Sequence, residues 1–292
     1  MSDHPAPTYG PTYVLTVDCP DGPGLIHAVS GFLLERSGNI LELQQYENHR
    51  EGRFFQRIHF EVLDGAASLS GLREEFVPLA QRYGMHWQMR AADAPCRTLI
   101  MVSKDGHCLN DLLFRWRSGA LQVEVASVVS NHRNLEPLAQ TYGVPFHHVP
   151  VTRTTKAAAE KRLLELVEHE RVDLVVLARY MQILSDGLCE ALAGRAINIH
   201  HSFLPSFKGA KPYHQAFDRG VKLVGATAHY VTGDLDEGPI IEQDVVRVDH
   251  RASVEEIVAA GRDVEAQVLA RAVKWHAQTR VLLNGHKTVV FR

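Results

Sequence analysis

The sequence lacks several features that define common classes of protein. None of its four cysteines belongs to a Cys-x-x-Cys pair, so their spacing favours neither a zinc ribbon nor a dithiol motif and fits a reducing compartment. Runs of Lys and Arg are absent and the formal net charge is -3, which disfavours a nucleic-acid-binding surface. Residues 1–11 lack the apolar core of a signal peptide, and no later apolar stretch could span a bilayer. We therefore expect a cytoplasmic protein with neither nucleic-acid nor membrane partners.

The length and composition predict a globular chain with two domains. At 292 residues and 45% hydrophobic side chains, the chain can bury a sizeable core. Small residues and a proline at 91–95 (AADAP) are typical of a linker. We therefore predict one domain over 1–91 and a second over 97–292.

The first domain shows the pattern of a βαββαβ unit. Residues 58–62 alternate between apolar and polar, which is typical of a half-buried antiparallel strand. The periodicity predicts strands at 13–17, 40–46, 58–62 and 85–89, and helices over about 25–33 and 69–83. These elements predict a ferredoxin-like α/β domain.

Two motifs in this domain resemble those of the ACT family. They are DCPDGPGL at 18–25, at the turn before the first helix, and SGNI at 37–40, after that helix. ACT domains usually bind amino acids or dimerise, so the resemblance implies an amino-acid effector, with glycine or methionine as candidates, and a homo-oligomer. The candidate effector-binding residues are Asp21, Gly22, Gly24 and Asn39. Glycines at the start of a helix can expose backbone N–H groups to a carboxylate, although the same turn could serve only to begin the helix.

The second domain alternates apolar runs with helical patterns. Strands are predicted at 98–102, 123–129, 174–177 and 196–199, with helices at 109–117, 135–142 and 156–169 between them. This order predicts a doubly wound, mostly parallel, Rossmann-like sheet. Such sheets bind ligands beyond the carboxyl ends of their strands, and residues 198–202 lie at such an end.

Three polar residues near that position suit acyl chemistry. Asn198 can donate to a developing oxyanion, His200 can move a proton near neutral pH, and Asp236 can orient the histidine or activate water. Taken singly, each could be a loop residue that satisfies backbone groups. Their occurrence together, in INIHHSFLPSFKG at 197–209 and DLDEGPI at 234–240, favours catalysis.

The segment 197–243 resembles the folate-dependent formyltransferase family. The resemblance implies Asn198, His200 and Asp236 as the catalytic residues and 10-formyltetrahydrofolate as the formyl donor. Residues 179–185 resemble the loop that lines the folate pocket in that family. The predicted substrate-binding residues are Met181, Gln182, Ile183, Leu184, His229 and Asp234. We expect no separate cofactor and no metal, because the adjacent histidine pairs at 147–148 and 200–201 do not define a tetrahedral site.

The loop at 102–109 bears on the formyl acceptor. Transferases that act on glycinamide ribonucleotide carry a glycine-rich phosphate-binding turn at the corresponding place, whereas this loop reads VSKDGHCL. Water then becomes the expected nucleophile. The ACT-like domain joined to a formyltransferase-like domain is similar to the family of formyltetrahydrofolate deformylases. This resemblance implies hydrolysis of 10-formyltetrahydrofolate to tetrahydrofolate and formate, with the formate supplied to purine biosynthesis.

Two alternatives remain open at this stage. One is a formyltransferase with a different amine acceptor. The other is a non-catalytic regulator that senses folate or an amino acid.

Overall fold

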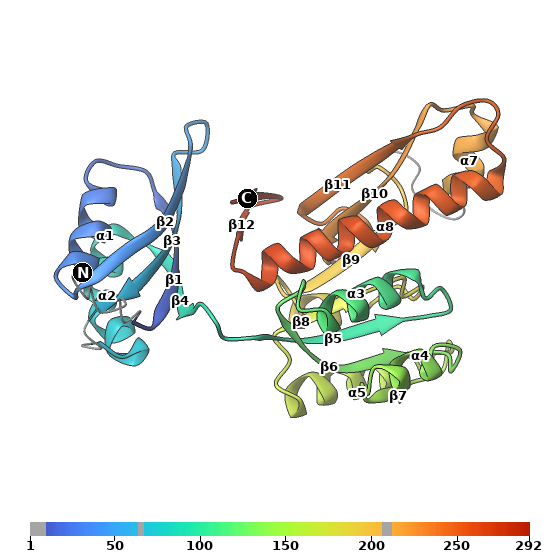
Figure 1. The fold of residues 1–292 in the computed structure, drawn as a ribbon, viewed down its shortest axis with the longest axis horizontal. Helices are drawn as coiled ribbons and strands as arrows, with labels where there is room; N and C mark the ends of the chain where they lie inside the picture. The colour runs from blue at the N-terminus through green and yellow to red at the C-terminus, as the bar shows by residue number, and fades with distance from the viewer. Residues whose placement is uncertain (1–9, 64–66, 206–211) are drawn as a thin grey trace, which may run out of the picture. The chain divides into compact units, whose positions relative to one another are not determined.

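The chain divides into two compact units (Figure 1). The computed structural model describes residues 10–63, 67–205 and 212–292. The first unit comprises Met1–Ala94, Gln278–Leu282 and Val289–Arg292, and the second comprises Pro95–Ala277 and Leu283–Thr288. The sequence predicted one crossing between residues 91 and 97. The chain in fact crosses again after Ala277, because apolar residues near its C-terminal end pack against the first sheet, as described below.

The first unit is a four-stranded antiparallel sheet with two helices. Its elements are β1 (Thr12–Pro20), α1 (Leu25–Leu34), β2 (Gly38–Asn48), β3 (Arg53–Val62), α2 (Leu69–Tyr83) and β4 (His86–Ala91). The strand order is β2-β3-β1-β4, which confirms the predicted ferredoxin-like βαββαβ arrangement. Ser68 caps the start of helix α2, where its hydroxyl accepts from the Gly71 N–H. Gly84 caps the end of the helix in the left-handed conformation.

Both faces of this sheet are covered. On one face, residues such as Leu15, Phe60 and Phe76 form the core. On the other face, Phe55 packs with Leu282, Val289 and Phe291 from the C-terminal strands β12 (Val281–Asn284) and β13 (Lys287–Val290) and the residue beyond them. Arg57, which is 4% exposed, donates to the carbonyls of Gln278 and Thr279 and pairs with Glu42 at 2.8 Å. The end of the chain therefore completes the first unit.

The second unit contains a seven-stranded sheet. Its elements are β5 (Cys96–Val102), α3 (His107–Arg117), β6 (Val123–Ser130), α4 (Glu136–Thr141), β7 (Phe146–His148), α5 (Lys156–His169), β8 (Leu174–Leu177), α6 (Asp186–Ala191), β9 (Ala196–His200), α7 (Pro212–Asp218), β10 (Leu223–Tyr230), β11 (Ile240–Arg247) and α8 (Val254–Ala277). The strand order is β11-β10-β9-β8-β5-β6-β7. Neighbouring strands are parallel throughout the run β9-β8-β5-β6-β7. Strand β10 is antiparallel to both of its neighbours, β9 and β11. The predicted doubly wound, mostly parallel sheet is confirmed.

The strand order reverses between β5 and β8, where such sheets place their ligands. Ser103, which follows β5, holds the segment after β8 in place. Its hydroxyl accepts from the Met181 N–H at 3.0 Å, and its own N–H donates to the Arg179 carbonyl at 3.2 Å. The start of the segment 179–185 is therefore held beside the carboxyl end of β5.

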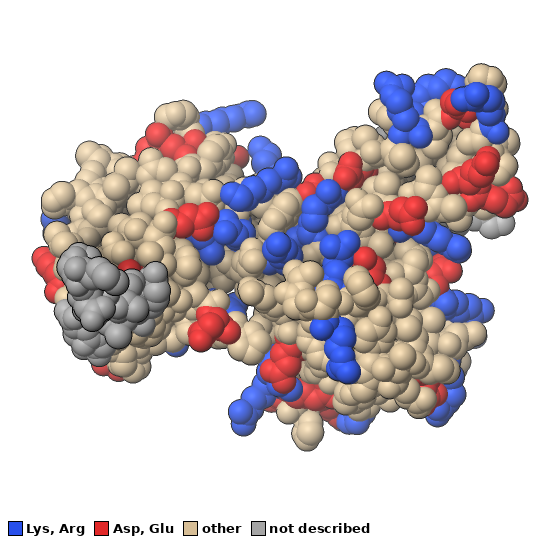
Figure 2. Space-filling model, in the orientation of Figure 1, with Lys and Arg blue, Asp and Glu red and all other residues tan. Residues whose placement is uncertain are grey.

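The surface mixes charges of both signs. On the face shown in Figure 2, Lys and Arg side chains lie among Asp and Glu side chains. Examples include the ion pair of Arg36 with Glu75 and that of Arg133 with Glu136. Among the helices that the structure describes, none is both long and apolar enough to cross a membrane.

Candidate active site

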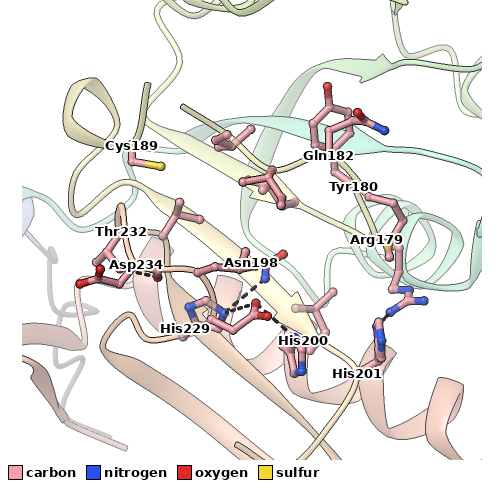
Figure 3. Close-up of a pocket in the computed structure, with 18 of the residues that line it drawn as sticks. Arg179, Tyr180, Gln182, Cys189, Asn198, His200, His201, His229, Thr232 and Asp234 are labelled. Carbon is pink, nitrogen blue, oxygen red and sulfur yellow. Dashed lines mark hydrogen bonds and ion pairs between the residues drawn. The ribbon is translucent and has the colours of Figure 1, made fainter. Parts of the chain in front are cut away.

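Strand periodicity places Asn198 and His200 on one face of β9. Successive strand side chains alternate, so these two residues point together while Ile197 and Ile199 face the other way. The antiparallel neighbour β10 sets His229 directly opposite Asn198. Two strands thereby bring three polar side chains to the carboxyl end of the parallel sheet (Figure 3).

Asp236 reaches this group from the loop between β10 and β11. Its backbone has φ 58°, in the left-handed region that Asp and Asn tolerate better than most residues. The loop lies close against β10, since a Cβ on Gly238 would come within 1.7 Å of the Tyr230 carbonyl oxygen. Position 238 therefore accepts only glycine. In this loop, Asp236 Oδ1 lies 3.2 Å from His200 Nδ1.

His229 supports Asn198. Burial lowers the pKa of His229 despite the opposing effects of the Tyr230 carbonyl and Asp236, so its imidazole is neutral at physiological pH. Its Nδ1–H donates to the Tyr230 carbonyl at 2.9 Å, and its Nε2 accepts from Asn198 Nδ2 at 3.2 Å. Both ring nitrogens are used. This arrangement favours a positioning role in place of the direct substrate contact that we expected from the sequence.

His200 keeps one ring nitrogen for chemistry. Its side chain is 6% exposed, and its Nδ1 faces Asp236. Within the described ranges, its buried Nε2 has no hydrogen-bond partner. A buried imidazole nitrogen without a partner is costly unless a ligand supplies one. His200 Nε2 is therefore available to an oxyanion or a leaving group.

A cavity of about 570 Å³ opens in front of these residues. All nine residues that the sequence assigned to catalysis and substrate binding line it: Asn198, His200, Asp236, Met181, Gln182, Ile183, Leu184, His229 and Asp234. Met181 and Ile183 are 55% and 62% exposed, so they present open apolar surface in this cavity. Polar groups and exposed apolar side chains therefore line the same cavity.

Sequence reasoning missed several lining residues. Tyr213 comes from α7 and Val258 from α8, whereas Arg179 lies in the predicted pocket-lining segment 179–185 but was not singled out there. Tyr213 lies close against α8, since a Cβ on Gly261 would meet its ring at 2.2 Å. The pairing of a glycine and a tyrosine 48 positions apart carries no sequence signal that one chain reveals.

The candidate effector residues do not form one cluster. Asp21, Gly22 and Gly24 lie at the turn between β1 and α1, and Gly24 has φ 88°. Asn39 on β2 and Thr12 on β1 both pair with Glu61 of β3. Asn39 is therefore level with the start of β1, whereas the turn follows the end of β1. The two ends are roughly 25 Å apart at about 3.3 Å per residue. The Asn39 amide also donates to Glu61 at 2.8 Å, so within one chain Asn39 lies away from the turn, and the effector-binding role of these four residues stays a prediction.

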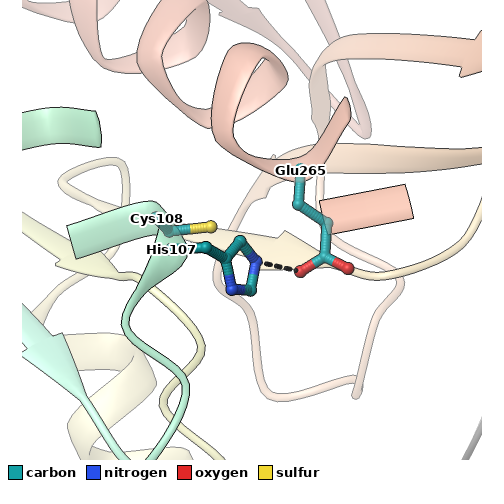
Figure 4. A group of neighbouring side chains, drawn as sticks. All are labelled: His107, Cys108 and Glu265. Carbon is teal, nitrogen blue, oxygen red and sulfur yellow. Dashed lines mark hydrogen bonds and ion pairs between the residues drawn. The ribbon is translucent and has the colours of Figure 1, made fainter. Parts of the chain in front are cut away.

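His107, Cys108 and Glu265 form a buried group that the sequence did not indicate (Figure 4). Their potential ligand atoms lie within 4.8 Å of one another. Glu265 already accepts from Tyr213 at 2.7 Å and pairs with His107 at 2.9 Å and Arg179 at 3.3 Å. Burial and the Glu265 charge raise the pKa of the Cys108 thiol well above its usual range. A protonated thiol is a poor metal ligand, and the Glu265 carboxylate is already occupied by its partners. The expectation of no metal stays a prediction.

The fold and this Asn–His–Asp site define a domain of the formyl transferase class. The formyl transferase family model matches residues 96–273. The crystal structure of glycinamide ribonucleotide transformylase 1 from Symbiobacterium toebii is 32% identical, with a TM-score of 0.63. That similarity covers 68% of this chain and 95% of the transformylase chain.

Other relatives match almost the whole chain. Formyltetrahydrofolate deformylase of Corynebacterium sp. (strain P-1) is 54% identical over 280 residues, which is 96% of this chain and 98% of that protein. The crystal structure of formyltetrahydrofolate deformylase from Burkholderia mallei is 52% identical with a TM-score of 0.93, and covers 97% of this chain and 100% of its own. The chain belongs to the formyltetrahydrofolate deformylase family.

Proposed function

We propose that this chain hydrolyses 10-formyltetrahydrofolate to tetrahydrofolate and formate. The observation that carries the proposal is that Asn198, His200 and Asp236 line one cavity together, in a chain that matches deformylases over nearly its full length. An amide donor, an imidazole and a carboxylate are the groups that acyl transfer to water requires.

The exposed apolar side chains of the cavity suit the folate. Met181 and Ile183 offer their side chains to the flat faces of a ring system, and burying them there removes apolar area from water at about 25 cal/mol per Å². Gln182 and the backbone of the same segment can pair with the polar edge of the pterin. Asp234, on the loop after β10, is exposed and can accept a hydrogen bond.

The first chemical step is the attack of water on the formyl carbon. Asp236 accepts a proton from the water as its oxygen bonds to that carbon, and the carbonyl electrons move onto oxygen. Asn198 donates its second Nδ2–H to the new oxyanion, because the first is held by His229. Protonated His200 supplies a further donor from its unpartnered Nε2.

The second step breaks the bond between the formyl carbon and N10. The oxyanion electrons re-form the carbonyl, and N10 takes up a proton as it leaves. His200 is placed to give that proton, directly or through a water molecule. Asp236, which took up the water's proton in the first step, then passes it back to His200. Water, formyl-folate and enzyme thus give formate, tetrahydrofolate and the enzyme in its starting state after one proton is released to solvent.

The loop after β5 supports water as the acceptor. Asp105 of this loop lies 3.4 Å from Arg179 Nη2 and 3.6 Å from Arg262 Nη2, so both nearby guanidinium groups already face a carboxylate. A ribonucleotide phosphate would have to displace or repel that carboxylate. We therefore expect no formylated product from glycinamide ribonucleotide.

The deciding experiment is turnover of 10-formyltetrahydrofolate by the full chain with no added acceptor. Stoichiometric release of formate and tetrahydrofolate supports the proposal. Formyl transfer to an added amine that outruns formate release would instead establish a transferase. Binding of folate without turnover would establish a regulator.

We further propose that the first unit assembles the protein and binds an amino-acid effector. Strand β2 is an edge strand, and Leu41 and Leu43 on it are 48% and 37% exposed, which suits pairing with a second copy. The turn at 21–24 offers backbone N–H groups at the start of α1. Sedimentation of the protein, and formate release with and without glycine or methionine, test the two roles separately. A cytoplasmic location and supply of formate to purine biosynthesis also stay predictions.

A further inference from the structure

Arg179 is buried at the junction of three segments. Its side chain is only 12% exposed, and its backbone in the segment after β8 has φ 67°. The guanidinium pairs with Asp105 after β5 and with Glu265 on α8. A third contact runs from Nη1 to Nδ1 of His201, the residue that follows β9. Figure 3 shows Arg179 directed at the His201 ring.

The contact with Arg179 fixes the proton of His201. A guanidinium has only N–H donors and keeps its charge in proteins, so His201 Nδ1 can only accept. An imidazole that accepts at Nδ1 is neutral and carries its proton on Nε2. A protonated His201 would present an N–H to the guanidinium and lose this hydrogen bond.

The local charges also oppose protonation of His201. Arg179 and Arg262 carry two positive charges, and Asp105 and Glu265 carry two negative ones. Burial alone would raise the pKa of Glu265, but hydrogen bonds from His107 and Tyr213 and the charge of Arg179 outweigh it and lower that pKa. Among the residues that the structure describes, these two guanidinium and two carboxylate groups balance with His201 neutral, and His107 also contacts Glu265. An imidazolium would add an unbalanced buried charge.

His201 in turn stacks on His200. The ring centroids are 5.1 Å apart and the planes differ by 13°. Asp236 and His229 face His200, and Arg179 and Tyr213 face His201. Two stacked imidazoles at this distance repel each other when both are protonated. If one of the two rings stays neutral, the other can therefore carry the positive charge.

We propose that Arg179, held by Glu265 and Asp105, is a positioning residue that keeps His201 neutral with its proton on Nε2, so that His200 alone carries the positive charge of the stacked pair. The part that concerns His200 rests on the proposed hydrolysis. The part that concerns His201 does not, because its protonation state can be measured without substrate.

The first test uses the unaltered full-length protein. Long-range proton–nitrogen NMR of labelled histidines, assigned with His201→Gln, reports which ring nitrogen of His201 carries the proton. We expect the Nε2–H form with no titration between pH 8 and about pH 5, although an unperturbed histidine titrates near 6.5. A His201 that carries its proton on Nδ1, or titrates near 6.5, overturns the proposal whether or not the protein hydrolyses formyl-folate.

The second test changes the donor. In Arg179→Gln the amide oxygen can accept from a protonated Nδ1, so we expect His201 to titrate between pH 5 and 8. Formate release should then fall at least about tenfold as pH drops through that titration, with KM changed less than about threefold. Arg179→Lys keeps a donor without an acceptor and should restore both the tautomer and most of kcat.

A matched control is Arg271→Gln. Arg271 also bridges two carboxylates, Glu242 and Asp244, but it does not line the cavity. We expect it to leave His201 and the pH profile of kcat unchanged. A folded Arg179→Gln protein in which His201 stays neutral, with an unchanged pH profile, would contradict the positioning role.

Discussion

Replacing Asp236 with Asn removes one negative charge from the active site and keeps the size of the side chain. Asn tolerates the left-handed conformation at φ 58°, so the loop should fold as before. The carboxylate lies 3.2 Å from His200 Nδ1, and opposite unit charges about 4 Å apart attract by roughly 4 kcal/mol near a protein surface. Loss of a general base costs about 10²- to 10⁴-fold on its own. We expect kcat to fall by about 10²- to 10⁴-fold.

The assay measures formate release from 10-formyltetrahydrofolate without an acceptor, together with the dissociation constant of tetrahydrofolate and the melting temperature. Folate affinity should change by less than about threefold, because the apolar segment at 181–184 is untouched. Asp234→Asn is the matched control, since this aspartate lies in the same loop and lines the same cavity but is exposed. It should raise KM more than it lowers kcat. Near-normal kcat in a folded Asp236→Asn protein would remove Asp236 from the mechanism.

Three further predictions concern other parts of the site. Asn198→Ala should lower kcat by about 10²- to 10³-fold as an oxyanion donor is lost, and wild-type kcat would show that Asn198 is not that donor. Gly238→Ala should destabilise the fold by about 3 kcal/mol or more in thermal unfolding, since its Cβ would meet the Tyr230 carbonyl oxygen at 1.7 Å, whereas Gly187→Ala, whose Cβ meets nothing within 4 Å, should not destabilise it. Dialysis against a chelator should leave kcat unchanged, because Glu265 is already paired with Arg179, and loss of activity restored by zinc would refute this.

Much of the fold follows from local pattern. The helices Leu69–Tyr83 and Lys156–His169 and the strand Leu174–Leu177 lie where periodicity predicted them. Strands β10 and β11 were not predicted as elements, because their residues were interpreted as motif. The return of Gln278–Leu282 to the first unit was also missed, since pairing between residues more than 200 positions apart depends on tertiary packing rather than local propensity.

The candidate site divides in the same way. Asn198 and His200 are two positions apart on one strand, so their shared face follows from the period of a strand alone. The contact of Arg179 with Glu265 joins the segment after β8 to α8, and only the folded sheet brings them together. The motif therefore predicted residues that line the cavity, and the supporting network could come only from the structure.

The route of the chain constrains the order in which the protein can be completed. Residues 278–292 leave the ribosome after residues 95–277 of the second unit, yet Phe291 covers Phe55 in the first. During synthesis the first sheet therefore waits with one apolar face open to solvent or to chaperones while the catalytic sheet is made. Arg57 likewise gains its carbonyl acceptors at Gln278 and Thr279 only at that late stage. The unit translated first is thus among the last parts of the molecule to mature.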